Sequence, residues 1–228
     1  MGLRYSAGGS EILKGVDAGM PGGSITAVVG PSGAGKSTLL RAINRLIEPT
    51  AGEVYLDGEP TSGMDPLALR RRVGMVFQLP ALFGATVEEA TLYGARLAGK
   101  DADAGRLLEM AGLDASFEDK APQALSVGEQ QRVSIARTLA LEPEALLMDE
   151  PTSALDEAAR RRIEDLIREL NASLGLTLVV VSHDLDQVER VADRVVVLVR
   201  GRSEGEWGRD EFFSGPGERA RRYISGRS

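Results

Sequence analysis

One run of residues near the N-terminus has the types and spacing needed to hold phosphate groups. It matches in full the pattern G-x-x-x-x-G-K-[ST] and reads Gly30-Pro31-Ser32-Gly33-Ala34-Gly35-Lys36-Ser37-Thr38. Glycines in such a loop turn successive backbone N–H groups toward phosphate oxygens, and a helix that begins there adds the partial positive charge of its N-terminus. Lys36 would reach β- and γ-phosphate oxygens, and the Ser37 hydroxyl would ligate Mg²⁺. The run therefore predicts a nucleotide-binding site.

Two acids follow an apolar run in the second half of the chain. Residues 145–148 read Ala-Leu-Leu-Met, and Asp149 and Glu150 come directly after them. Carboxylates at the C-terminal end of a parallel strand lie where open α/β sheets bind ligands. Asp149 can hold Mg²⁺ through water, and Glu150 can accept a proton from a water that attacks the γ-phosphate. A solvated strand end is the plain alternative, and the phosphate-binding run favours the functional interpretation.

Short apolar runs alternate with longer amphipathic segments, which predicts a parallel α/β sheet. The expected strands are residues 25–29, 72–77, 145–148, 178–181 and 195–199, and helical spacing covers residues 38–47 and 157–174. Strand signals disappear between residues 80 and 141, where helix-like segments cover 87–97, 102–111 and 128–141. We expect one domain over residues 1–228, with a core of residues 1–78 and 142–228, an N-terminal β part, and an inserted helical subdomain at 79–141. The sequence after Gly201 reads as a short polar tail.

Composition excludes several classes of protein. The chain has 228 residues, 43% of them hydrophobic and 27% charged, which is typical of a folded globular domain. A net charge of −7 argues against binding nucleic acid through bulk charge. With no cysteine, the chain has neither a disulfide framework nor a thiolate nucleophile. Its longest apolar runs are shorter than the ~18 residues of a membrane helix, and no signal peptide is expected.

A third motif resembles the signature L-S-G-G-Q-Q-R of the ATP-binding subunits of ABC transporters. It reads Leu125-Ser126-Val127-Gly128-Glu129-Gln130-Gln131-Arg132. The resemblance implies a phosphate-loop NTPase core with an ABC-type helical subdomain, and a homodimer that forms on ATP binding. In that dimer Ser126, Val127, Gly128 and Glu129 would face the ATP of the opposite subunit.

The signature departs from the family pattern at two positions, Val127 for glycine and Glu129 for glutamine. The Cβ of Val127 bars easy access to positive φ, so we expect slower turnover if the loop needs that conformation. Independently of any family, Ser126-x-x-Glu129 predicts a capping box that opens a helix. Such a helix start offers N–H groups to an anion.

Four further positions match functional residues of the family. Tyr5 resembles the aromatic residue that stacks on adenine, and Gln78 resembles the glutamine that senses Mg²⁺ and the attacking water. His183, the only histidine, resembles the switch residue that contacts the γ-phosphate, and Asp156 lies in a segment like the loop that crosses the dimer interface. The structural alternatives are a half-buried strand tyrosine, a solvated strand-end glutamine, a structural histidine and a helix N-cap.

The resemblance implies ATP hydrolysis, with ATP and Mg²⁺ as cofactors, coupled to solute movement through a separate transmembrane permease subunit. The chain would lie peripherally on the cytoplasmic face of the cell membrane, with the apolar segment 79–83 contacting the permease or, alternatively, packing in the subdomain core. One alternative is a soluble ABC-type ATPase acting on DNA or ribosomes. Only one cassette is present, however, and Lys36 and Ser126 lie 90 positions apart, too close for a long coiled-coil insertion. No nucleic acid partner is expected.

A catalytically inactive partner subunit is a further alternative. It is disfavoured by the presence of Lys36, Asp149, Glu150 and His183. The stretches 71–78 and 82–87 are similar to both phosphate importers and small metal exporters, so the sequence leaves the solute and the direction of transport open.

Overall fold

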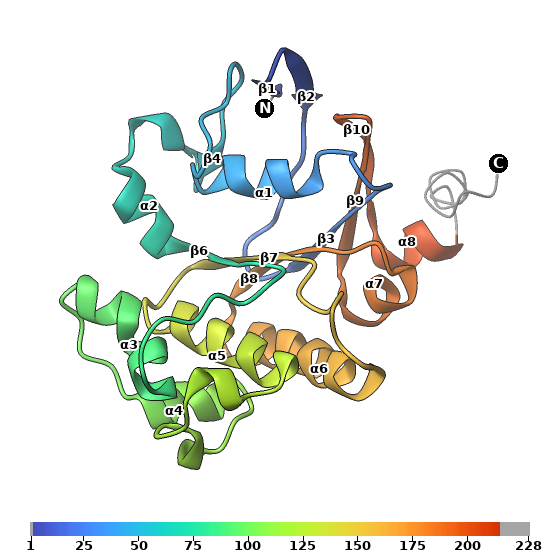
Figure 1. Cartoon of the computed structure of the whole chain (residues 1–228). Coiled ribbons are helices and arrows are strands. Elements are labelled where there is room, and N and C mark those ends of the chain that lie inside the picture. Colours follow the sequence, from blue (N-terminus) through green and yellow to red (C-terminus); the bar gives the residue numbers. More distant parts are fainter. Residues whose placement is uncertain (1, 215–228) are drawn as a thin grey trace.

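The computed structural model describes residues 2–214, and a six-stranded sheet forms its centre (Figure 1). The strand order is β10-β9-β3-β8-β7-β6, and all neighbours are parallel except β10 and β9. The strands are β3 (Ile25–Val29), β6 (Val73–Val76), β7 (Ala145–Asp149), β8 (Thr177–Val181), β9 (Arg194–Val199) and β10 (Arg202–Gly208). The predicted α/β class with a parallel-rich sheet is confirmed.

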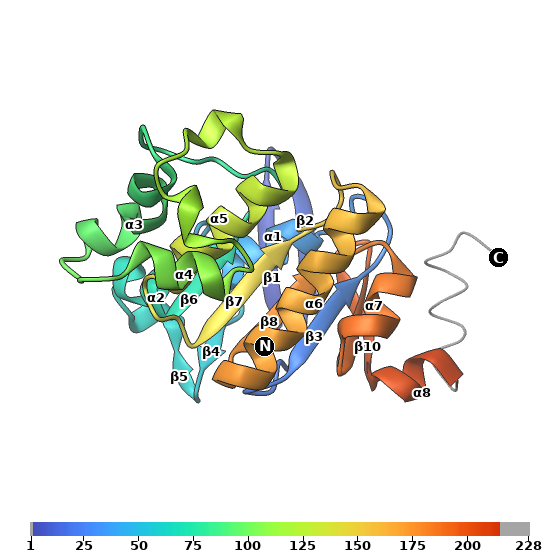
Figure 2. The same ribbon diagram turned by 90° about the horizontal axis from the view of Figure 1, so that it is seen from below.

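Helices cover both faces of this sheet, which is why its central strands are apolar throughout. Every residue of β3 and β7 is buried. Figure 1 shows α1 (Lys36–Ile43) on one side and α5 (Val127–Leu139) and α6 (Glu157–Leu174) on the other; Figure 2 shows these two helices lying over the strands. The apolar stripe of α6 packs against the sheet through Ile163, Leu166, Ile167 and Leu170.

Two antiparallel hairpins lie on the α1 side of the sheet. The first joins β1 (Leu3–Ala7) to β2 (Ser10–Val16), and the second joins β4 (Tyr55–Leu56) to β5 (Glu59–Pro60). Their half-buried side chains pack on a core that includes Leu39 and Leu40 of α1. A short helix, α2 (Pro66–Arg72), then leads the chain into β6.

The segment between β6 and β7 contains α3 (Val87–Leu97), α4 (Ala104–Met110) and α5 (Figure 2). One apolar cluster joins these helices to the sheet, since Leu108 and Ile135 belong to the same cluster as Leu146 and Leu178. Helix α3 has the predicted bounds, whereas α4 begins later than expected because Asp103 accepts a hydrogen bond from the backbone N–H of Arg106 and caps it.

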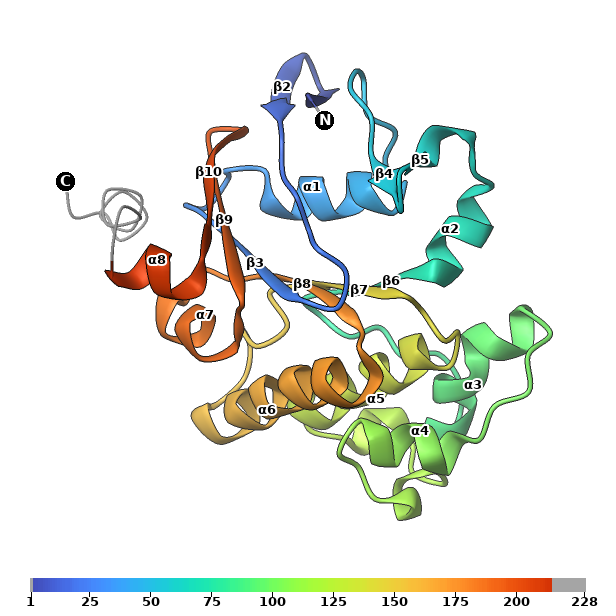
Figure 3. The ribbon, with the colours of Figure 1, turned by 180° about the vertical axis from the view of Figure 1, so that it is seen from behind.

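The interpretation of the sequence after Gly201 as a polar tail is wrong for residues 202–214. This segment forms the edge strand β10 and the helix α8 (Arg209–Ser214), and Figure 3 shows both beside α7 (Leu185–Val191). Phe212 is fully buried and packs edge-on against Phe213. The edge strand alternates exposed and half-buried residues, so its polar sequence gives no signal for a strand paired with β9. Within residues 2–214, no helix is long and apolar enough to cross a bilayer.

A buried ion pair fixes α6 to α7. The Glu164 side chain is 2% exposed and accepts hydrogen bonds from Arg190 Nε and Nη2 at 2.8 and 2.7 Å. Arg190→Ala should lower the free energy of unfolding by about 3 kcal/mol, because it removes both hydrogen bonds from Arg190 to a buried carboxylate. Urea titration measures this. The matched control is Arg161→Ala, whose 50% exposed side chain lies 3.9 Å from Glu164 and should cost less than about 1 kcal/mol; equal losses would contradict the prediction.

Candidate functional site

Four loops meet at the carboxyl ends of the parallel strands. They follow β3, β8, β7 and β6, which are neighbours in the sheet, and carry Lys36, His183, Glu150 and Gln78. The last paired residues of β7 and β8 are Asp149 and Val181. Because the strands are parallel, their carboxyl ends lie together, which is where such sheets bind ligands.

The phosphate-binding loop is held tightly between β9 and the first hairpin. A Cβ atom at Gly30 would lie 1.9 Å from the carbonyl oxygen of Leu198, so only glycine fits there. Gly35 has φ +100°, and a Cβ there would lie 2.9 Å from Leu13 Cδ2. The N–H of Gly201 also donates to the Ala34 carbonyl at 3.0 Å. The loop shape is therefore set by close backbone approach on two sides.

Lys36 is the buried cation of this loop. Its side-chain Nζ donates to the carbonyl oxygens of Gly30 and Pro31 at 2.8 and 3.1 Å, and the residue is only 6% exposed. Burial lowers the pKa of Lys36 below its ordinary value of 10.5, while Glu150 and Asp149 act in the opposite direction. A phosphate group would supply this ammonium with an anionic partner in place of the water that burial has removed.

Ser37 and Asp149 meet across the loop. Ser37 Oγ donates to Asp149 Oδ1 at 2.7 Å, and Asp149 is 4% exposed. A hydroxyl and a carboxylate are oxygen ligands of the kind that Mg²⁺ prefers when phosphate and water complete its shell. No group of three or more His, Cys, Asp or Glu side chains able to hold a metal occurs in residues 2–214. The pair fits a metal that enters with phosphate.

Glu150 and His183 face each other across the ends of β7 and β8. His183 Nδ1 lies 3.2 Å from Glu150 Oε2, and Glu150 has φ +46°, a left-handed conformation that is strained for a side chain of its size. Gln78 joins this group indirectly: its Nε2 donates to Ser153 Oγ at 3.1 Å, and Ser153 Oγ donates to the Glu150 carbonyl at 3.1 Å.

The signature segment forms the predicted capping box at the start of α5. The backbone N–H and the hydroxyl of Ser126 both donate to Glu129 Oε2, at 2.8 and 2.7 Å, and these bonds hold the pKa of the Glu129 carboxyl below its usual range. Val127 is the first helical residue and does not have positive φ, so its Cβ introduces no backbone strain. Gly128 lies against α6, where a Cβ would be 3.0 Å from the Cβ of Ala159.

Tyr5 is a half-buried strand residue and Asp156 is a helix N-cap, which are the structural alternatives to their predicted functional roles. Tyr5 lies on β1, is half-buried and pairs with Leu13, the residue beside Gly35. Asp156 caps α6 by accepting from the N–H of Ala159 at 2.8 Å. The additional roles that the sequence predicts for these two residues stay predictions.

Three polar side chains near these loops have contacts that the sequence did not predict. Gln131 and Arg137 of α5 donate to the carbonyls of Phe77 and Ala81, at 3.1 and 2.6 Å, and so tie α5 to the segment after β6. Burial lowers the pKa of Arg137. Gln187 of α7 is 1% exposed. The sequence feature that could have identified these residues is a polar side chain at a helix position that faces the apolar core.

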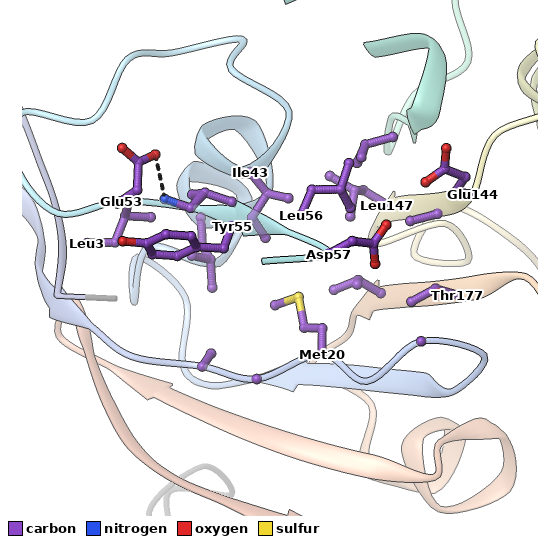
Figure 4. Close-up of a pocket in the computed structure, with 18 of the residues that line it drawn as sticks. Leu3, Met20, Ile43, Glu53, Tyr55, Leu56, Asp57, Glu144, Leu147 and Thr177 are labelled. Atoms are coloured by element: carbon purple, nitrogen blue, oxygen red, sulfur yellow. Dashed lines mark hydrogen bonds between the residues drawn. The ribbon is translucent and has the colours of Figure 1, made fainter. Parts of the chain in front are cut away.

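A cavity of about 350 Å³ lies at the opposite ends of the strands (Figure 4). Its wall includes Met20, Leu56 and Leu147, and the carboxylates of Asp57 and Glu144 lie at its side. Thr177, at the start of β8, also lines it. The cavity contains no part of the phosphate-binding loop, and its acidic groups would repel phosphate, so it is not the nucleotide site.

Comparison with known proteins supports the resemblance to ABC transporter subunits that the sequence motifs indicate. The profile of the family described as "ABC transporter" matches residues 13–153. The chain is 54% identical over 201 residues to Protein STAR1 of Oryza sativa subsp. japonica, an alignment that covers 87% of this chain but only 58% of that protein.

A longer alignment and a solved structure extend the match. The chain is 39% identical over 250 residues to the phosphate import ATP-binding protein PstB of Parasynechococcus marenigrum (strain WH8102), covering 99% of this chain and 91% of that protein. It superposes with a TM-score of 0.78 and 36% identity on a dimeric post-hydrolysis structure of the ATP-binding cassette MJ0796 bound to ADP and Pi, covering 90% and 95% of the two chains.

Proposed function

The chain belongs to the ABC transporter family, in which it is an ATP-binding, ATP-hydrolysing subunit, and we propose that it drives solute movement through a separate transmembrane permease subunit. One observation carries the proposal. Lys36, the Ser37–Asp149 pair and the Glu150–His183 pair lie together at the carboxyl ends of the strands. These groups supply phosphate binding, metal ligation and proton transfer in one place.

The proposed chemistry assigns one task to each group. The N–H groups of residues 30–38 and the ammonium of Lys36 bind the phosphates, with Ser37 and Asp149 as the side chains that would hold Mg²⁺. Mg²⁺, when bound, neutralises charge on the phosphate oxygens. Glu150 accepts a proton from the water that attacks the γ-phosphorus, and the bond from that phosphorus to the ADP oxygen breaks. His183 orients Glu150 and contacts the γ-phosphate.

The remaining site residues have supporting roles in this proposal. Gln78 aligns the attacking water and adds a metal ligand; Tyr5 stacks on adenine. Asp156 and residues 126–129 complete the site of a second copy, so that two chains enclose two ATP molecules. The dimeric state of the cassette MJ0796 supports this arrangement. We also propose that residues 79–141 move as a helical subdomain against the core of residues 1–78 and 142–228.

An exposed apolar surface beside Gln78 supports the permease as partner. Leu79 and Phe83 are 69% and 57% exposed, and Phe83 packs against the 46% exposed Tyr93 with ring centroids 5.7 Å apart. Exposed aromatic groups of this kind mark interaction sites. Docking there would keep the chain on the cytoplasmic face of the membrane. Likeness to the import protein PstB supports an importer over a small metal exporter.

Affinity purification tests the proposal. Tagged Glu150→Gln protein, extracted from native membranes in mild detergent with ATP, should retain a multi-span membrane protein in stoichiometric amount. The matched variant that also carries Phe83→Asp should lose it. Recovery of ribosomes or DNA-bound factors without a membrane protein would contradict the transporter assignment and favour the soluble alternative.

Glu129→Gln should accelerate ATP hydrolysis. Glu129 places a carboxylate on the hydroxyl of Ser126, where the proposed dimer brings a γ-phosphate, and like charges a few Å apart cost about 1 to 4 kcal/mol. Glutamine can still accept from the Ser126 N–H, so the helix cap persists. We expect kcat/KM to rise about fivefold at low salt and less at high salt, because salt screens the repulsion. The exposed control Glu109→Gln should change nothing; an unchanged rate in Glu129→Gln would contradict the repulsion.

A further inference from the structure

A buried chain of polar side chains joins the segment after Glu150 to the segment before His183. Gln187 Nε2 donates to Thr152 Oγ1 at 2.8 Å, and Ser182 Oγ donates to Gln187 Oε1 at 2.7 Å. Thr152, Ser182 and Gln187 are 5%, 4% and 1% exposed. Both polar atoms of the glutamine side chain are thus used, one toward each loop.

The fold of α7 does not itself call for glutamine at this position. Its neighbours Val188 and Val191 are apolar and buried in the same helix, and the N-terminus is already capped by Asp184, which accepts from the N–H groups of Asp186 and Gln187. A buried amide loses its hydration and recovers it only through well-made hydrogen bonds. An apolar side chain of similar size would pack there without that requirement. The hydrogen bonds to the two loops therefore explain why a glutamine is buried at this position.

Besides the Glu150–His183 contact, a backbone hydrogen bond and an ion pair also join these loops. The paired register of β7 and β8 ends at Asp149 and Val181, and beyond it the N–H of Glu150 donates to the Val181 carbonyl at 3.2 Å. A second side-chain link runs from Arg160 Nη1 to Asp184 Oδ2 at 3.1 Å, but these side chains are 30% and 28% exposed, so solvent weakens it. The Gln187 link is the one shielded from water.

We propose that Gln187 is a positioning residue for ATP hydrolysis: its amide holds the Glu150 loop and the His183 loop at the spacing that places the Glu150 carboxylate against the attacking water. The proposal rests on the roles assigned above to Glu150 and His183. Those two side chains lie 3.2 Å apart, and displacement of a reacting group by about 1 Å can cost a hundredfold in rate. Gln187 itself touches neither nucleotide nor water in this scheme.

Gln187→Met tests the proposal because methionine keeps the length of the side chain and removes both hydrogen bonds. In steady-state assays with saturating Mg-ATP, below the unfolding temperature, hydrolysis should slow by at least tenfold. KM for ATP should change less than twofold, since the phosphate loop is untouched. A purely structural residue would lower the unfolding midpoint and leave the rate of the folded protein unchanged. The matched control is Glu189→Met, at an exposed position of the same helix, which should behave as wild type.

A second variant removes the same link from the other side. Thr152→Val keeps the shape of the threonine and deletes the acceptor of the Gln187 amide, so it should slow hydrolysis with KM again unchanged. The double variant should be little slower than Gln187→Met alone, because both changes break one connection. Additive losses, or wild-type rates in both single variants, would overturn the proposal.

Glu150→Gln, measured in the same assay, separates this proposal from the assignment it rests on. Loss of hydrolysis in Glu150→Gln with normal rates in Gln187→Met would overturn the positioning role alone. Wild-type turnover in Glu150→Gln would overturn the assigned base and the positioning role together.

Discussion

Glu150→Gln should reduce the rate of ATP hydrolysis by about 10² to 10³-fold while leaving ATP affinity within about twofold of wild type. A positioned general base contributes about that factor, and the amide cannot take a proton from water. Glutamine keeps the size of the side chain, and none of the hydrogen bonds of Lys36 involves Glu150, so the geometry of the phosphate loop should persist.

Radiometric hydrolysis and equilibrium ATP binding measure the two quantities on the same preparation. The control is Glu169→Gln, an exposed acid on α6 that should retain full turnover. Should Glu150→Gln turn over ATP at the wild-type rate, the proton must go elsewhere, and the 3.2 Å contact with His183 would then be a structural one.

Lys36→Met should weaken ATP binding by about 10- to 100-fold. Hydrogen bonds from a charged group contribute about 1.5 to 3 kcal/mol, and methionine retains only the apolar stem of the lysine. The buried ammonium now bonds to two carbonyls within its own loop, which the phosphates would replace as acceptors. Titration calorimetry measures the affinity, with Arg41→Met on the exposed face of α1 as the control.

The pH dependence of wild-type binding provides a second readout for Lys36. Burial lowers its pKa below 10.5, and phosphate stabilises the charged form and raises that pKa again, so ATP binding takes up a proton on the alkaline side. Affinity should therefore fall as the pH rises through the lowered pKa of the free protein, and Lys36→Met should lack this dependence. ATP affinity equal to wild type in Lys36→Met would refute the phosphate-loop assignment.

The signature segment departs from the family pattern at Val127 and Glu129, and these two departures have different structural effects. The sequence raised the question of whether the Cβ of Val127 strains the loop. The structure answers it, because Val127 lies at a helix start without positive φ. The departure with a proposed consequence is Glu129, whose carboxylate accepts a hydrogen bond from the Ser126 hydroxyl.

The sequence by itself determined the parts of the site that lie within a few residues of one another. The phosphate loop is a local structure, in which a buried strand, glycines and a helix start follow directly along the chain. The capping box at Ser126 and the cap at Asp156 likewise join residues three positions apart, and the structure contains both. For the same reason the bounds of α3 and α6 followed from the spacing of their apolar residues.

Only the tertiary structure decided which distant groups meet. Ser37 and Asp149 are 112 positions apart, and they touch because β3, β8 and β7 are neighbours in a parallel sheet. The link from Gln187 to Thr152 crosses 35 positions for the same reason. Strand β10 and helix α8 were missed because a solvated edge strand has a polar sequence, and because burial of Phe212 depends on the sheet that it covers. Strand order and side-chain pairing follow from how the whole chain packs, and no local pattern contains that information.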